Sequence, residues 1–76
     1  MKQKIIKILS DLRPEFDFTE EVDFINEGML DSFDVFNLTV SLEQEFKIKI
    51  DGMDIIAKNF TGIDKIIKLL NKYGVE

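Results

Sequence analysis

Apolar residues recur every three or four positions in three separate segments of this chain. The first segment, residues 2–12, carries Ile5, Ile8, Leu9 and Leu12, with Ile6 at the edge of the stripe. The second runs from about Ser32 to Phe46, and the third carries Ile63, Ile66, Ile67, Leu70 and Tyr73. This spacing puts apolar side chains on one face of an α-helix. The pattern predicts an all-α fold, a small bundle of three main helices without strand pairing.

Local signals predict where these helices begin and end. Pro14 ends the first helix at or before Arg13, because a residue that precedes proline avoids the helical conformation. Thr61 and Asp64 have the spacing of a capping box at the start of the last helix. Gly74 suits the C-terminal cap of that helix.

The segments between the helices differ in character. Residues 15–30 are acidic and aromatic without a clear period, which predicts a long connection held to the core by its apolar residues, with a possible single helical turn from Thr19. Residues 48–50 alternate briefly and predict an extended link. After a turn at Asp51 and Gly52, residues 54–58 are predicted to form the short fourth helix of the bundle.

A chain of 76 residues is one domain near the lower size limit for independent folding. Without cysteine it has no disulfide or thiolate zinc site, so helix packing alone must hold it together. No apolar run approaches the roughly 20 residues that cross a bilayer. Lysines interrupt the apolar residues at the start and no cleavage site follows, which argues against a signal peptide. We expect a monomeric single domain, 1–76, in the cytoplasm.

The net charge of −5 is divided unevenly along the chain. Residues 14–54 carry twelve acidic side chains and two lysines, a net charge of −10, whereas residues 1–13 and 55–76 carry +3 and +2. An acidic protein is a poor partner for nucleic acid. A basic protein surface is the partner expected for the acidic block.

The second helix has two apolar stripes rather than one. Its broader stripe, the predicted core face, comprises Val35, Leu38, Thr39, Leu42 and Phe46. A narrower stripe comprises Phe33, Phe36 and Val40, with Glu43 beside it. Either neighbouring segments cover the narrower stripe, or it is an exposed apolar patch of the kind that marks a binding surface.

The sequence GMLDSFDVF, residues 28–36, places Ser32 between two aspartates at the start of this helix. A serine nucleophile needs a base, and the chain has no histidine and no lysine in the serine-bearing turn. Without histidine or cysteine the metal options are poor, and no calcium loop or glycine-rich phosphate loop is present. On spacing alone, Ser32 is more simply a helix cap than a modified residue. A phosphate ester there would be favoured by the helix dipole and opposed by Asp31 and Asp34.

Residues 28–34 resemble the attachment motif of the acyl carrier and peptidyl carrier protein family, in which an Asp-Ser pair follows a short loop containing glycine. Residues 42–46, LEQEF, resemble the end of that family's second helix, residues 47–50 its onward link, and residues 59–73 its last helix. The resemblance therefore covers nearly the whole chain. It implies that Ser32 carries 4'-phosphopantetheine through a phosphodiester, and that a thiol at the far end of this arm holds an acyl or aminoacyl group.

The same resemblance implies the partners and the surface that they contact. They are a phosphopantetheinyl transferase and the acyl- or aminoacyl-activating and transferring enzymes, with basic docking surfaces. The expected docking residues are Asp31, Phe33, Asp34, Phe36, Val40 and Glu43.

The sequence indicates the family more clearly than it indicates which group the carrier holds. Phe33 stands where fatty-acid carriers typically have leucine. The segment GMLDSF, residues 28–33, instead resembles that of stand-alone aminoacyl carriers, including the D-alanyl carrier proteins. Those proteins usually have glycine where this chain has Asp34. We expect a non-catalytic carrier of acyl groups in fatty acid or secondary metabolite biosynthesis, with an aminoacyl carrier as the alternative. Outside the family, the alternative is a small helical interaction protein whose serine is a cap.

Overall fold

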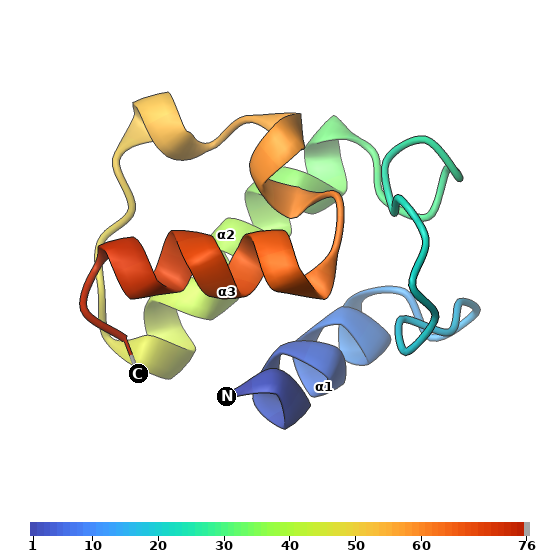
Figure 1. Ribbon diagram of the computed structural model, residues 1–76, viewed down its shortest axis with the longest axis horizontal. Coiled ribbons are helices and arrows are strands. Elements are labelled where there is room, and N and C mark those ends of the chain that lie inside the picture. The colour runs from blue at the N-terminus through green and yellow to red at the C-terminus, as the bar shows by residue number, and fades with distance from the viewer. Residues whose placement is uncertain (76) are drawn as a thin grey trace.

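The computed structural model of the protein describes residues 1–75 and contains three α-helices: α1 (Lys2–Leu12), α2 (Ser32–Phe46) and α3 (Ile63–Lys72) (Figure 1). Two short 3-10 helices, η1 (Gly52–Asp54) and η2 (Ala57–Phe60), lie between α2 and α3. Residues 1–75 include no β-strand. The predicted all-α fold with three main helices is therefore confirmed. Within the described residues, no helix combines the length and the apolar character that a membrane crossing requires.

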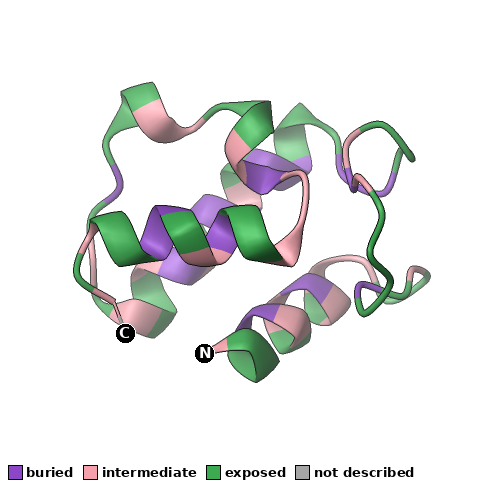
Figure 2. Ribbon diagram, viewed as in Figure 1, coloured by how far each residue is buried: buried purple, intermediate pink, exposed green. Residues whose placement is uncertain are grey.

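The core lies where the apolar faces of the three helices meet. Figure 2 shows the buried positions of each helix on one side and exposed positions on the other. The helices contribute fully buried side chains, namely Ile5, Leu9, Leu38, Leu42, Ile66 and Leu70. Leu69 is also buried, although the predicted stripe of the last helix omitted it.

The long connection, residues 13–31, adds aromatic side chains to this core. Phe18 and Phe24 are buried, and their rings meet edge to face with centroids 5.0 Å apart. The Phe24 amide donates to the Thr61 carbonyl at 2.8 Å, which ties the connection to the start of α3. The connection is thus held by its apolar residues, as predicted. The turn near Thr19 is not helical, because the Asp17 carboxylate accepts from the Thr19 amide at 2.9 Å and closes a local turn.

The end of α3 matches its prediction, and its start does not. Gly74 has a φ of 84°, its amide donates to the Asn71 carbonyl, and the Val75 amide donates to the Leu70 carbonyl. These two hydrogen bonds form a Schellman motif. The capping box predicted at Thr61 is absent. Thr61, the residue after η2, has helical backbone angles (φ −76°, ψ −15°), so Gly62, whose backbone is extended, takes the cap position.

The prediction of one short helix over residues 54–58 is wrong. The Asp51 carboxylate accepts from the Met53 amide at 2.8 Å and starts η1 earlier, at Gly52. Asp54 is the last residue of η1, and its carboxylate contacts the end of α3: Lys72 Nζ lies 2.8 Å away, and the hydroxyl of Tyr73, the residue after α3, also donates to it. The chain passes Ile55 in a non-helical conformation and begins again as η2.

Candidate functional site

Two aspartates organise the first turn of α2 around Ser32. The Asp31 carboxylate accepts from the Asp34 amide at 2.9 Å, and the Asp34 carboxylate accepts from the Asp31 amide at 3.1 Å. This reciprocal capping box makes Asp31 the N-cap and places Ser32 at the first helical position. Neither hydrogen bond uses the Ser32 hydroxyl, and Ser32 is exposed. The interpretation of Ser32 as the helix cap is therefore wrong.

Arg13, at the end of α1, clamps this turn in place. Its Nε and Nη2 atoms donate to Asp34 Oδ2 at 3.0 and 2.7 Å, and Nη2 lies 3.6 Å from Asp31 Oδ2. The Arg13 hydrogen bond lowers the pKa of Asp34 below its ordinary value, against the opposing effect of burial. The guanidinium therefore offsets negative charge on both sides of Ser32 and joins the end of α1 to the start of α2.

Arg13 was not predicted from the sequence to be part of the site. Its contact with Asp34 spans 21 positions and depends on how α1 packs on α2. The only local signal was the position of Arg13 at the end of a helix, before Pro14.

The capping box and the clamp exclude Asp34 from the docking residues expected from the sequence. Only 5% of Asp34 is exposed, and its carboxylate is engaged by Arg13 and by the Asp31 amide. These contacts are all made to Oδ2, and the residue is almost fully buried, so Asp34 presents little carboxylate surface to another protein. We assign Asp34 a structural role instead.

The narrower apolar stripe of α2 lies open to solvent. Phe33 is 71% exposed, Phe36 58% and Val40 37%, while Val35, Leu38, Thr39 and Leu42 on the other face are buried. The alternative in which neighbouring segments cover this stripe is wrong. Glu43 borders the stripe and is half-buried, because its carboxylate accepts from the Ile50 amide at 2.8 Å. Because the sequence predicts that Phe33, Phe36 and Val40 are docking residues, we call them the docking stripe.

A small hollow of about 230 Å³ adjoins Ser32. It is formed by the long connection, the start of α2 and the link between η1 and η2, and is lined by Ile25, Asp31, Ser32, Val35, Ile55 and Ala57. Most of its wall is apolar, with the aspartate and the serine as the polar exceptions. It is suited to part of a flexible, mainly apolar group attached at the serine.

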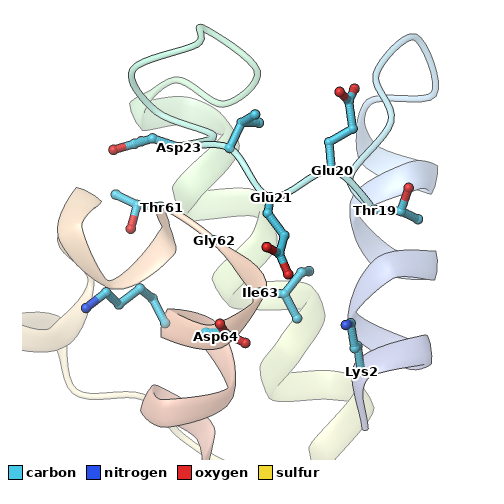
Figure 3. Close-up of a pocket in the computed structure, with 11 residues that line it drawn as sticks. Lys2, Thr19, Glu20, Glu21, Asp23, Thr61, Gly62, Ile63 and Asp64 are labelled. Atoms are coloured by element: carbon cyan, nitrogen blue, oxygen red, sulfur yellow. The ribbon is translucent and has the colours of Figure 1, made fainter.

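A second hollow, of about 310 Å³, lies between the long connection and the starts of α1 and α3 (Figure 3). Figure 3 shows Glu21 extending toward the start of α3 while Glu20 points the other way, so these carboxylates do not converge. Among residues 1–75, no group of three or more acidic side chains is placed to hold a metal ion. The two hollows share no lining residue.

The surroundings of Ser32 fit a phosphodiester-linked group. The hydroxyl is at the positive end of a 15-residue helix, where backbone N–H groups favour an anion. Arg13 compensates the two flanking carboxylates, which would otherwise repel a phosphate. Exposure of the serine leaves room for a modifying enzyme, and the apolar hollow lies beside it.

Comparison with known proteins agrees with this assessment. A family model described as "Phosphopantetheine attachment site" matches residues 3–70, which is most of the chain. No match was found among curated proteins or among solved structures. The chain belongs to the phosphopantetheine-binding family of acyl and peptidyl carrier proteins, and such a domain carries covalently attached 4'-phosphopantetheine.

Proposed function

We propose that the protein is a non-catalytic acyl carrier protein, with residues 1–76 forming one carrier domain and Ser32 as its attachment site. The main support for this assignment is that the residues that cap α2 are different from the serine at its start. Asp31 and Asp34 supply the capping contacts, so the exposed Ser32 hydroxyl has no part in holding the helix. When bound, the prosthetic group supplies a thiol for thioester formation, which this cysteine-free chain lacks.

The residues around Ser32 have separate roles in this proposal. Ser32 Oγ is the point of attachment. The first-turn amides of α2 and the helix dipole favour the negative charge of the phosphodiester. Asp31 and Asp34 fix the backbone of the turn through their reciprocal hydrogen bonds. Arg13 holds Asp34 and reduces the repulsion between the two carboxylates and the phosphate.

The proposed partners are a phosphopantetheinyl transferase and the enzymes that load and unload the carrier. The docking stripe begins at Phe33, the residue after Ser32, so an enzyme that binds at this serine would also contact Phe33. Asp31 and Glu43 lie at the borders of the stripe. The cytoplasmic location and the monomeric state remain predictions of the sequence.

An acyl group is the proposed cargo, and an aminoacyl group is the alternative. The hollow beside Ser32 favours an acyl chain, because its wall includes Ile25, Val35 and Ile55. If the hollow shelters an acyl chain, the thermal midpoint of the loaded protein should rise as the chain is lengthened from two to about eight carbons. An aminoacyl carrier predicts no such trend and should be loaded instead by an adenylating enzyme.

The experiment that tests the attachment site uses intact-mass measurement. The wild type, Ser32→Ala and Ser41→Ala are each incubated with a broad-specificity phosphopantetheinyl transferase, coenzyme A and magnesium. Ser41 is the matched control, since it is a serine on the same helix. We expect one added phosphopantetheinyl group in the wild type and in Ser41→Ala, and none in Ser32→Ala. An unmodified wild type that is folded and initially free of the group would overturn the proposal.

A further inference from the structure

The segment between α2 and α3 that contains η1, residues 51–59, has little apolar anchoring of its own. Ile50 and Phe60, which flank it, are buried, and of the apolar residues between them only Ile55 packs partly against the core. No residue of η1 is buried, and Met53 within it is 85% exposed. Burial of apolar surface therefore does little to fix the position of this segment.

Polar contacts with the end of α3 hold the segment instead. Lys72 Nζ donates to both carboxylate oxygens of Asp54, at 3.0 and 2.8 Å. The Tyr73 hydroxyl donates to the same carboxylate and accepts from the Asp51 amide at 3.0 Å. The Asn59 side-chain amide donates to the Asp54 carbonyl at 2.8 Å, so Asp54 connects η1 to η2 as well as to α3. We call the contacts of Asp54 with Lys72 and Tyr73 the latch.

The latch differs from an exposed ion pair, which would contribute little to stability. The Asp54 side chain is only 19% exposed, and its carboxylate accepts from two side chains at once. The Tyr73 ring packs partly against the core, so the position of its hydroxyl is fixed by the fold. Hydrogen bonds to a charged and shielded group are stronger than those between neutral groups. The latch therefore fixes η1 against α3.

The residue after Asp54 forms part of the hollow beside Ser32. Ile55 and Ala57 line this hollow of about 230 Å³, whose other apolar lining residues are Ile25 and Val35. Figure 1 shows the chain running from the end of α2 through η1 and on to η2. The part of the wall that comes from this segment is therefore held in place one residue away from Ile55, by the latch.

We propose that the latch limits how far the hollow beside Ser32 opens, and thereby sets the length of the acyl chain that the carrier shelters. This inference rests on the proposed function, because the chain enters the hollow from its attachment at Ser32. With the latch closed, the hollow accepts a short chain. A longer chain must displace Ile55 and break the contacts of Asp54, so the loss of these contacts offsets the gain from further apolar burial.

Hydrogen exchange of the unmodified chain tests whether the latch holds η1. Tyr73→Phe removes the hydroxyl and keeps the ring, and Lys72→Gln removes the charge. The matched control is Lys68→Gln, because Lys68 is also an exposed lysine of α3 and does not contact Asp54. The amides of Asp54 and Ile55 both donate within η1. We expect them to exchange about tenfold faster in the two latch variants, and within about twofold of wild type in the control.

Acyl groups of different length test the consequence for the cargo. A broad-specificity transferase and acyl-coenzyme A place chains of about two to about fourteen carbons on Ser32. The thermal midpoint of each loaded protein is compared with that of the same variant carrying phosphopantetheine alone, so the stability of the variant itself cancels. In the wild type and Lys68→Gln, the gain should level off at about eight carbons. In Tyr73→Phe and Lys72→Gln, it should continue to rise with longer chains.

The outcomes separate this inference from the proposed function. Exchange at Asp54 and Ile55 that rises no more than in Lys68→Gln, or no more than at the core amides of α2, overturns the latch. Faster exchange together with the same dependence on chain length in all variants overturns the link between the latch and the cargo, and leaves the carrier assignment intact. A folded chain that accepts no phosphopantetheinyl group overturns both the proposed function and this inference.

Discussion

Replacement of Asp34 by alanine removes both the capping box and the Arg13 clamp, so its effect on stability can be worked out from the structure. Loss of a helix-cap interaction costs about 1 kcal/mol. Loss of charge-assisted hydrogen bonds costs a further ~1.5 kcal/mol, the low end of the usual range, because Arg13 is partly exposed and is hydrated in the variant. We expect Asp34→Ala to lower the free energy of unfolding by about 2–3 kcal/mol, against a total of roughly 4–11 kcal/mol for a domain of this size.

Urea unfolding followed by circular dichroism measures this loss. With a slope of about 1 kcal/mol/M for a small domain, the midpoint should fall by about 2–3 M. The matched control is Asp11→Ala, which removes an exposed carboxylate paired only with Lys7 and should leave the midpoint nearly unchanged. A shift for Asp34→Ala no larger than that of the control would refute the clamp.

The pH dependence provides an independent check of the same interaction. Because Arg13 lowers the pKa of Asp34 in the folded state, this carboxylate binds protons more readily in the unfolded chain. Its stabilising effect is complete above the unfolded pKa of about 3.9 and disappears as the pH falls through the lower folded pKa. The stability difference between wild type and Asp34→Ala should therefore be constant near pH 7 and shrink below about pH 4.

Three further predictions follow from single features of the fold. In thermal unfolding, Ser32→Ala should leave the free energy of unfolding unchanged, whereas Asp31→Ala should lower it by about 1 kcal/mol. Equal losses in the two variants would contradict the assignment of Asp31 as the cap. Gly74→Ala should cost about 1 kcal/mol in thermal unfolding, from the positive φ alone, since a Cβ at Gly74 would meet no atom within 4 Å. Phe60→Ala should cost about 3–5 kcal/mol because the ring is fully buried, and a urea midpoint close to that of the wild type would show that the core is misassigned.

The three main helices were predictable because their signals are local. Apolar periodicity predicted α1 and α2, and Pro14 and Gly74 marked helix ends through the backbone conformations that they impose or permit. Periodicity also indicated that Phe33 and Phe36 do not face the core, since one helix cannot turn two separate stripes toward the same small core, but it left open whether neighbouring segments cover them.

The details of the site depended on contacts between distant residues. Asp31 with Asp34 and Thr61 with Asp64 have the same spacing, yet only the first pair forms a capping box. The difference arises because Thr61 directly follows η2 and has helical backbone angles instead of the extended backbone of a cap residue. The structural role of Asp34 also could not be predicted from the sequence, because its burial and its contact with Arg13 depend on how α1 packs on α2.

The central claim is that Ser32, and no other serine, carries the prosthetic group, and direct mapping of the modified wild-type chain tests it. Trypsin cleaves poorly between Arg13 and Pro14, so one large peptide, residues 8–47, contains Ser10, Ser32 and Ser41 together. Fragmentation of this peptide in the mass spectrometer must therefore locate the added group. The account predicts that the added mass lies on Ser32 alone. An added group on Ser10 or Ser41 would contradict it.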